Sequence, residues 1–349
     1  MEFDVQDKKI GDGHPVFFIA EAGVNHNGSL ELGYKLIDAA LGAGADAIKF
    51  QTFKADKLNT KNAPKSSYHV ETTGSDDKQT WYELLKTQEL SKEQHLHLKN
   101  YCNSKGIIFL STPYDEESAD MLDEIGLPLF KLASTDTNNI PFVQHIAKKG
   151  KPIIISTAFC EMVEVQAAVN AIRSEGVDSF VVLQCTGNYP AILDDSHLNV
   201  ISTYRKQLRC LVGYSDHALG SINAIASTAL GSCVYEKHFT IDKLLPGPDH
   251  RMSLTPAELK ETIHAVRLTE RALGSPEKRT LPSEAENRIK LRKSIVAAHN
   301  IEKGTVLKRE MIEFKRPGTG ISPAKLDDLL GKTLKVDLQM DSILQEDMF

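Results

Sequence analysis

The sequence of 349 residues has few cysteines, one tryptophan and no long apolar run. Its five cysteines are widely scattered without any CxxC pair, so neither a disulfide framework nor a structural zinc site is expected. No apolar segment approaches the roughly 20 residues that a membrane-spanning helix needs, so no membrane partner is expected. Residues 1–15 are polar and contain no apolar h-region. We therefore expect no signal peptide and a cytoplasmic location.

The sequence also lacks an excess of positive charge. Lys and Arg number 41 against 47 Asp and Glu, which gives a formal net charge of −6. No basic stripe is interleaved with aromatic residues, so nucleic acid is not an expected partner. A GxSxG elbow is absent. The glycines of residues 42–47 precede a predicted strand instead of following one, so they indicate a helix end and not a dinucleotide-binding loop.

Eight short runs rich in β-branched and aromatic residues recur along the chain, separated by helical patterns. Apolar spacings of three and four indicate helices, one of which begins at the capping residue Ser91 and ends at Gly106. This α/β alternation favours a parallel (β/α)8 TIM barrel, with an open doubly wound sheet as the alternative. The predicted strands are 16–23, 47–52, 107–113, 129–135, 152–157, 180–186, 211–216 and 234–240.

Nearly every predicted strand ends in residues that can do chemistry. In a parallel barrel the carboxyl ends of all strands open on one face, so these side chains are expected to converge on one site. The polar ends are Glu21, Lys49, Gln51, Thr112, Lys131, Ser134, Thr157, Thr186, Ser215, His217, Glu236 and His238.

The chain is predicted to have two domains, a barrel over 1–276 and a small β-rich domain over 293–349, joined by a polar linker over 277–292. A long insertion over 53–90 follows the second strand on the catalytic side, where such loops often serve as lids; a plain surface excursion is the alternative. The terminal domain contains a repeat, because residues 300–312 align without gaps to residues 337–349. Two intertwined halves with approximate two-fold symmetry are expected, since neither could bury a core alone.

Two consecutive strand ends carry the strongest local signal. Alternation places Ser215 and His217 on one face of a strand, and Glu236 and His238 on one face of the next. Two imidazoles brought together beside carboxylates suit a divalent metal with positions open to water and substrate. The alternative is two separate histidines hydrogen-bonded in a polar core.

Lys49 and Lys131 point to the same predicted face from the second and fourth strands. A buried ammonium group needs a partner, which is either an anionic substrate group or a protein carboxylate such as Glu21 or Asp136. A Schiff-base lysine is a third possibility. Glu21 could bind a sugar hydroxyl or act as a general base. Asp249, in the loop after the eighth strand, could reach a polyol or serve only as a turn residue.

Ordered motifs along almost the whole chain resemble the N-acetylneuraminate (sialic acid) synthase family, including its C-terminal antifreeze-like (SAF, β-clip) domain. This resemblance implies condensation of phosphoenolpyruvate with N-acetylmannosamine, or a related 2-acetamido sugar, to a nine-carbon 2-keto acid and phosphate. The motifs are AEAGVNHNGS, IKFQTFKADKL, FLSTPYDEES, FKLAST, GYSDH, EKHFTIDK, PGPDHRMSLTP and KRPGTGIS.

The resemblance also implies roles for individual residues. His217 and His238 match metal ligands, with Mn2+ as the expected cation and Mg2+ or Co2+ as alternatives, and Glu236 is similar to the carboxylate beside metal-bound water. Arg316 matches an arginine that the SAF domain extends into the partner subunit of a domain-swapped homodimer. Positions similar to phosphoenolpyruvate-binding residues are Lys49, Thr112, Lys131, Ser134 and Ser215. Positions similar to residues near the acceptor sugar are Glu21, Gln51, Tyr189 and Asp249.

Three positions depart from the family pattern. Asp136 stands where many relatives have glutamate, Ala158 where glycine is common, and Gly187 where a polar side chain often helps to bind phosphate. The acceptor therefore stays open among N-acetylmannosamine, its 6-phosphate and the 2,4-diacetamido-6-deoxy sugar that leads to legionaminic acid. A metal-dependent hydrolase or pyruvate aldolase is a rival enzyme class, and a sugar- or ice-binding protein is a non-catalytic rival.

Overall fold

The computed structural model describes residues 1–349, which divide into two compact units. The first unit is Met1–Gly274 and the second is Ser275–Phe349. The residues predicted as a linker belong to the second unit, where they include an exposed short helix, α12 (Ala285–Leu291).

Eight parallel strands form a nearly closed barrel in the first unit, so the predicted TIM barrel is confirmed and the doubly wound sheet is wrong. Neighbouring strands follow the chain order around the barrel, and β10 pairs with β3. The strands are β3 (Phe17–Gly23), β4 (Ala47–Thr52), β5 (Ile108–Pro113), β6 (Phe130–Leu132), β7 (Ile153–Ser156), β8 (Phe180–Cys185), β9 (Leu211–Asp216) and β10 (Val234–His238).

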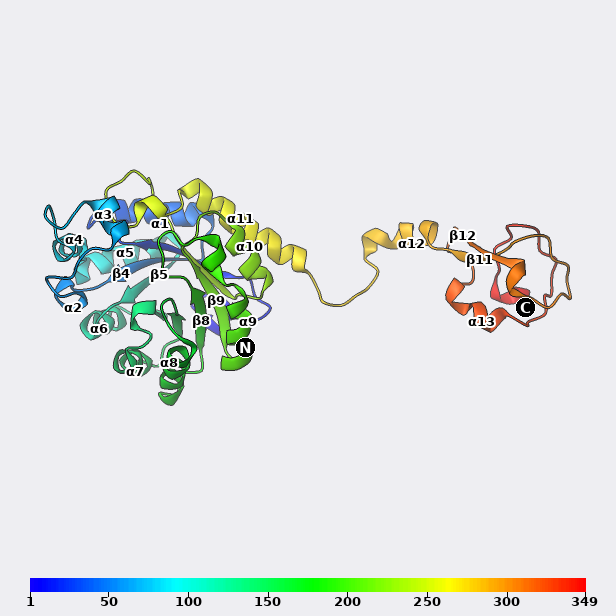
Figure 1. Cartoon of the computed structure of the whole chain (residues 1–349), viewed down its shortest axis with the longest axis horizontal. Coiled ribbons are helices and arrows are strands. Elements are labelled where there is room, and N and C mark those ends of the chain that lie inside the picture. Colours follow the sequence, from blue (N-terminus) through cyan, green and yellow to red (C-terminus); the bar gives the residue numbers. More distant parts are fainter. The chain divides into compact units, whose positions relative to one another are not determined.

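Helices surround the barrel strands, as Figure 1 shows for the first unit. The predicted start of one helix is confirmed, since Ser91 forms a capping box with Gln94 and the helix ends at Gly106. No helix of the chain is both long enough and apolar enough to cross a membrane. The outer helices are α1 (Leu30–Ala43), α5 (Lys92–Lys105), α6 (Glu116–Glu124), α7 (Ile140–Ala147), α8 (Met162–Ser174), α9 (Asn199–Leu208), α10 (Ile222–Ala229) and α11 (Pro256–Leu273).

An N-terminal hairpin of β1 (Glu2–Val5) and β2 (Lys8–Gly11) packs into the barrel interior. Its side chains Phe3, Val5 and Ile10 belong to the same buried cluster as inward residues of the barrel strands. This hairpin was not predicted from the sequence, because the segment is short and mostly polar. Apolar side chains therefore fill the barrel interior on the side where the hairpin packs. A cavity lined by the polar strand ends can open only on the opposite side of the barrel.

The long insertion after β4 contains three short helices, α2 (Ala55–Leu58), α3 (Ser67–Thr73) and α4 (Trp81–Gln88). The rings of His69 and Trp81 stack with centroids 4.2 Å apart. Arg251, in the loop after β10, lies 3.4 Å from Glu71 of the insertion. The insertion thus packs beside a loop at the carboxyl end of the barrel, and its function as a lid stays a prediction.

The second unit has the two-fold internal arrangement that the repeat predicts. Ile301 and Leu338 exchange backbone hydrogen bonds, each N–H donating to the other carbonyl at 2.8 Å. The N–H of Gly304 donates to Leu334, and in the second copy the N–H of Asp341 donates to Ala297. Aligning the two repeats places the residues of each of these last two bonds on those of the other, so the predicted two-fold arrangement is confirmed. The remaining elements are antiparallel β11 (Ser294–Ala297) and β12 (Ile312–Lys315), and α13 (Leu326–Leu329).

Three histidines, His26, His95 and His250, are buried beside the barrel strands, and each makes at least one hydrogen bond through a ring nitrogen. His95 accepts from or donates to the Thr52 hydroxyl at 2.7 Å, and its other ring nitrogen lies 2.9 Å from the Ser91 carbonyl. His250 contacts Thr240 at 2.6 Å, and His26 accepts from the N–H of Gly28. Burial lowers the pKa of His26 to about 3 and the pKa values of His95 and His250 to about 4.

These buried histidines predict a loss of stability in mild acid. In the unfolded chain a histidine titrates near pH 6.5, so below that pH the unfolded chain binds protons that the folded chain does not. Each of the three then lowers the free energy of unfolding by about 1.4 kcal/mol per pH unit. Urea unfolding between pH 7 and 5 measures this slope. His95→Gln should reduce the slope, whereas His97→Gln, at an exposed position of the same helix, should not; equal slopes for His95→Gln and wild type would contradict the assignment.

Candidate active site

One ring of side chains closes the apolar interior of the barrel at its carboxyl end. On strand after strand, the residue two positions beyond a buried inward residue is polar, because side chains alternate along a strand. Ile19 is thus followed by Glu21, and Ile154 by Ser156. The ring consists of Glu21, Lys49, Thr112, Lys131, Ser156, Cys185, Ser215 and Glu236.

All eight ring residues line a single cavity, together with side chains from the loops above them. Of the residues predicted for the site, Gln51, Ser134, Tyr189, His217 and His238 also line the cavity. The lining residues that sequence reasoning missed include Ser156, Tyr114, Cys185 and Phe159. Counting two positions from Ile154 would have found Ser156. Tyr114 follows β5, where its ring packs edge-on against Phe53, and no strand pattern points to it.

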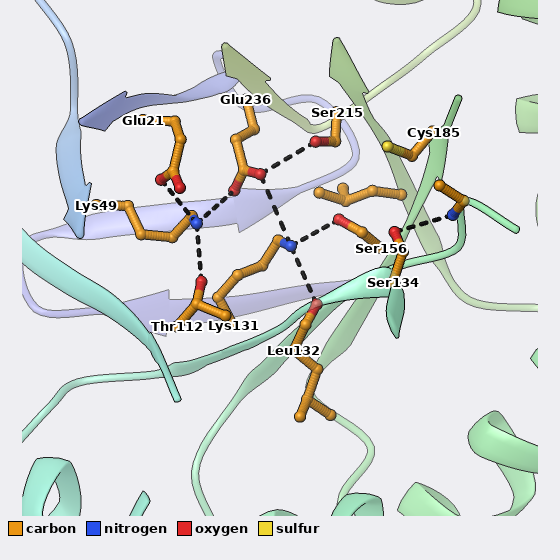
Figure 2. A network of polar contacts seen from close by, with 12 residues as sticks. Glu21, Lys49, Thr112, Lys131, Leu132, Ser134, Ser156, Cys185, Ser215 and Glu236 are labelled. Atoms are coloured by element: carbon orange, nitrogen blue, oxygen red, sulfur yellow. Dashed lines mark hydrogen bonds and ion pairs between the residues drawn. The ribbon is translucent and has the colours of Figure 1, made fainter. Parts of the chain in front are cut away.

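Lys49 lies between two carboxylates in the cavity. Its ammonium nitrogen is 2.7 Å from Glu21 Oε2 and 3.7 Å from Glu236 Oε2, and it donates to the Thr112 hydroxyl at 2.8 Å (Figure 2). The Gln51 amide donates to the other oxygen of Glu21 at 3.3 Å. Of the protein carboxylates considered for this lysine, Glu21 is the one that it contacts.

Lys131 lies on the other side of Glu236. Its ammonium nitrogen donates to Ser156 Oγ at 2.6 Å and to the Leu132 carbonyl at 3.0 Å, and it lies 3.7 Å from Glu236 Oε1 (Figure 2). Ser215 donates to the same carboxylate oxygen at 3.0 Å. Glu236 therefore joins both lysines. Asp136, the other carboxylate considered for a lysine, makes no contact with either ammonium group.

The two carboxylates differ in their affinity for protons. Burial raises the pKa of Glu21 to about 7, even though Lys49 opposes the shift. Burial would also raise the pKa of Glu236, but the ammonium groups of Lys131 and Lys49 outweigh it and hold this pKa below its usual range. Burial lowers the pKa of Lys131. Near neutral pH, Glu236 is thus ionised while Glu21 can exchange a proton.

His217 and His238 lie at the ends of β9 and β10 with ring centroids 5.5 Å apart, so their predicted proximity is confirmed. Nδ1 of His217 lies 2.7 Å from the Thr186 carbonyl, which leaves Nε2 free for another partner. Nδ1 of His238 is buried without any hydrogen-bond partner. Burial places the pKa of His238 well below its usual range, so this imidazole is neutral and can offer a nitrogen lone pair to a metal.

His217 and His238 could supply two imidazole ligands to a divalent cation. No group of three or more His, Cys, Asp or Glu side chains is arranged as a complete ligand set. Two imidazoles with an unpartnered buried nitrogen suit an ion that keeps positions open for water and substrate oxygens.

A buried ion pair fixes the two histidine-bearing strand ends from the outer face of the barrel. Lys237 Nζ lies 2.6 Å from Asp216 Oδ2, and both side chains are almost fully buried. Asp216 also accepts from the N–H of Ala218 at 2.9 Å, and Lys237 donates to the carbonyl of Ala218. Since Ala218 follows His217 directly, the pair ties the residues that flank both histidines.

Several predicted residues do not line the cavity. Thr157 and Thr186 point away from it, to the carbonyls of Leu183 and Asp195, because they stand one position beyond the inward-facing residues. Asp136 and Asp249 lie outside it, and burial raises the pKa of each to about 6. Arg316 belongs to the second unit, where it is exposed.

The Asp216–Lys237 pair predicts a large loss of stability when one charge is removed. Lys237→Met leaves Asp216 buried without its counter-charge, which should lower the free energy of unfolding by about 3–5 kcal/mol. Lys243→Met, which removes a half-exposed pair with Glu258, should cost about 0–1 kcal/mol. Urea unfolding of both variants compares the two losses. A loss as small for Lys237→Met as for Lys243→Met would contradict the assigned role.

Comparison with known proteins identifies the family of the chain. The NeuB family matches residues 36–278, and the SAF domain matches residues 292–349. The N,N'-diacetyllegionaminic acid synthase of Legionella pneumophila is 41% identical over 97% of this chain and 95% of its own length. The N-acetylneuraminate-9-phosphate synthase of Homo sapiens is 37% identical over 97% of this chain and 94% of its own length.

A solved structure extends the agreement to the fold. The N-acetylneuraminic acid synthetase of Leptospira borgpetersenii superimposes with a TM-score of 0.74 and 32% identity, covering 82% of this chain and 95% of that one. The chain therefore belongs to the NeuB family, as an enzyme of the sialic-acid-synthase type with a C-terminal SAF domain.

Proposed function

We propose that this enzyme condenses phosphoenolpyruvate with N-acetylmannosamine, or a closely related 2-acetamido sugar, to N-acetylneuraminate and phosphate. The observation that carries the proposal is one cavity in which two buried lysines and a row of hydroxyls lie beside a pair of histidines. An anionic donor needs the lysines and hydroxyls, and a carbonyl acceptor needs the histidines. The reaction requires both sets of groups next to each other.

The donor would bind at the lysine side of the cavity. Lys131, Ser134, Ser156 and Ser215 supply an ammonium group and three hydroxyls there, and Lys49 with Thr112 supplies a second cationic group. Charge-assisted hydrogen bonds from such fixed donors are the usual means of holding phosphate and carboxylate groups. Because the donors are on rigid strand ends, they need no rearrangement as charge moves onto the leaving phosphate.

The acceptor would bind beside His217 and His238. A divalent cation held by these residues, with Mn2+ expected and Mg2+ or Co2+ as alternatives, would act as a Lewis acid on the aldehyde oxygen of the open-chain sugar. C3 of phosphoenolpyruvate forms the new bond to the sugar aldehyde carbon. Gln51 and Tyr189 line this part of the cavity and offer hydrogen-bonding groups to the sugar hydroxyls.

Proton transfers fall to the two glutamates. Glu236, ionised between both lysines, can take a proton from the water that adds to C2 of the donor skeleton. Phosphate then leaves with its bridging oxygen. Glu21 can exchange a proton with a sugar oxygen, since its pKa of about 7 lies near a neutral operating pH.

The charges in the cavity favour an acceptor without a phosphate group. Lys49 and Lys131 are the only lysines of the lining, both are assigned to the donor, and no arginine lines the cavity. No cation of the lining is therefore left for a second phosphate. This favours N-acetylmannosamine over its 6-phosphate. The 2,4-diacetamido-6-deoxy sugar is the second candidate, supported by the likeness to the Legionella legionaminic acid synthase.

Arg316 would complete the site from a second subunit. It is exposed beside the SAF core and has no ion-pair partner within the chain. A domain-swapped homodimer would bring this guanidinium to the barrel of the partner, where it could bind an anionic or sugar oxygen.

Phosphate release measures the proposed reaction directly. With phosphoenolpyruvate, the purified enzyme should release phosphate when N-acetylmannosamine is added and not when its 6-phosphate is added, and the product mass should equal that of N-acetylneuraminate. Release only with the 2,4-diacetamido-6-deoxy sugar would establish the legionaminic alternative instead. Release with none of the three sugars would contradict both candidates.

Removal of the metal should abolish turnover. We expect an excess of chelator to stop phosphate release and added Mn2+ to restore it, because the histidines then regain the Lewis acid. His217→Gln and His238→Gln should each weaken Mn2+ binding, read from the spin-resonance signal of free Mn2+. His97→Gln, at an exposed position of α5, is the matched control and should bind as the wild type does. Full activity in excess chelator would refute the metal's role.

Complementation tests the shared site. Arg316→Ala and Lys131→Met should each be nearly inactive, yet their co-expression should restore about a quarter of the sites, since one barrel of each mixed dimer is then intact. The control pair Lys49→Met with Lys131→Met should restore none, because each barrel keeps one defect. Absence of recovery in the first pair, with mixed dimers isolated, would exclude the swap.

A further inference from the structure

Phe159 is an exposed aromatic residue at the rim of the cavity. It follows β7 by three positions, its side chain belongs to the cavity lining, and it is nevertheless 72% exposed. The ring therefore stands between the cavity and solvent. Neither the pattern of strand ends nor the ring of inward residues includes it.

The ring of Phe159 occupies the space that a side chain at position 187 would need. A Cβ built on Gly187 would lie 1.9 Å from Cζ of Phe159 and 2.2 and 2.6 Å from its two Cε atoms. These distances are far below any van der Waals contact, and the far edge of the ring accounts for all three. The departure at Gly187 and the aromatic ring at 159 are therefore two parts of one arrangement.

The backbone of Phe159 is held in an unfavourable conformation. Its φ is +65°, in the left-handed region, which costs a bulky residue about 1–3 kcal/mol. Neighbouring bonds keep it there, since the N–H of Ala158 donates to Ser134 Oγ at 2.9 Å and Thr157 Oγ1 donates to the Leu183 carbonyl at 2.8 Å. With the backbone held in this turn, the ring lies against Gly187, just beyond the end of β8.

This part of the rim belongs to the lysine side of the cavity. Ser134, which anchors the turn through Ala158, is one of the hydroxyls beside Lys131 and Ser156. The phenyl ring has no hydrogen-bonding group, so it can favour the binding of an anion there only by excluding water. Attraction between the anion and the ammonium group strengthens as water is excluded.

We propose that Phe159 is a donor-positioning residue that covers the phosphate end of the phosphoenolpyruvate site, and that Gly187 is glycine because the ring needs its space. The inference rests on the proposed function, since that function supplies the phosphate group. It assigns to this chain a hydrophobic cover over that end of the site.

The consequences for binding are specific. Without the ring, water and salt reach the bound phosphate, so affinity falls and becomes more sensitive to ionic strength. Ala at 187 displaces the ring and should act in the same direction. Once the ring is removed, the methyl group at 187 has no clash, so the two substitutions should not add.

Calorimetric titration of phosphoenolpyruvate into the full chain, without acceptor sugar and at two salt concentrations, tests the proposal. Phe159→Ala should weaken binding about tenfold, with a steeper dependence on salt, and raise the KM for phosphoenolpyruvate with little change in kcat. Gly187→Ala should be weakened at least as much, and the double variant no more than Phe159→Ala alone. Phe159→Leu, which keeps an apolar cover, should recover most of the affinity.

Two results would overturn the inference. One is wild-type affinity and salt dependence in Phe159→Ala, and the other is a double variant in which the two losses multiply. Thermal unfolding of each variant separates a folding defect from a binding defect, since Phe159→Ala is expected to keep the wild-type Tm within a few degrees. If wild-type protein binds no phosphoenolpyruvate, the proposed function fails first, which distinguishes that outcome from failure of the cover.

Discussion

In the barrel, β10 pairs in parallel with β9 on one side and with β3 on the other, so that Glu236 lies level with Ser215 and His238 lies level with Glu21. The rest of the site depends on this register. Side chains alternate along a strand, so a slip of one residue would turn Lys237 into the cavity and move Glu236 and His238 out of it. The buried pair of Lys237 with Asp216 on the outer face opposes such a slip, because either charge would lose its partner.

The same register gathers charges that would be unfavourable alone. Removing an ion from water costs several kcal/mol, and Glu21, Lys49, Lys131 and Glu236 are nearly inaccessible. Glu236 offsets part of that cost by contacting both ammonium groups and the Ser215 hydroxyl. The cavity therefore contains two cationic groups fixed in place before any substrate binds. Such preorganisation is the main means by which a rigid strand end can stabilise a transferring phosphate.

Much of this arrangement was predictable from local pattern. The recurrence of strands and helices along the chain predicted the barrel, and their place at strand ends predicted that Lys49 and Lys131 face the site. Alternation within a strand predicted the closeness of His217 and His238. The same rule, counted from Ile154, selects Ser156 and rejects Thr157, which was included because it ends its run. Tyr114, Asp136 and Asp249 lie on loops, where no period applies. The ring of Phe159 over Gly187 joins two loops, so only the folded chain brings them together.

In the proposed reaction, this cavity joins a phosphoenolpyruvate carbon to a sugar and releases phosphate by cleavage of the C–O bond. The most direct measurement uses phosphoenolpyruvate carrying ¹⁸O in its bridging position, with the isotope located by mass spectrometry after one round of turnover with N-acetylmannosamine. Because the C–O bond is cleaved, the released phosphate should carry the label. Label that stays with the three-carbon skeleton, with bulk-water oxygen in the phosphate, would mean P–O cleavage and would contradict the proposed reaction.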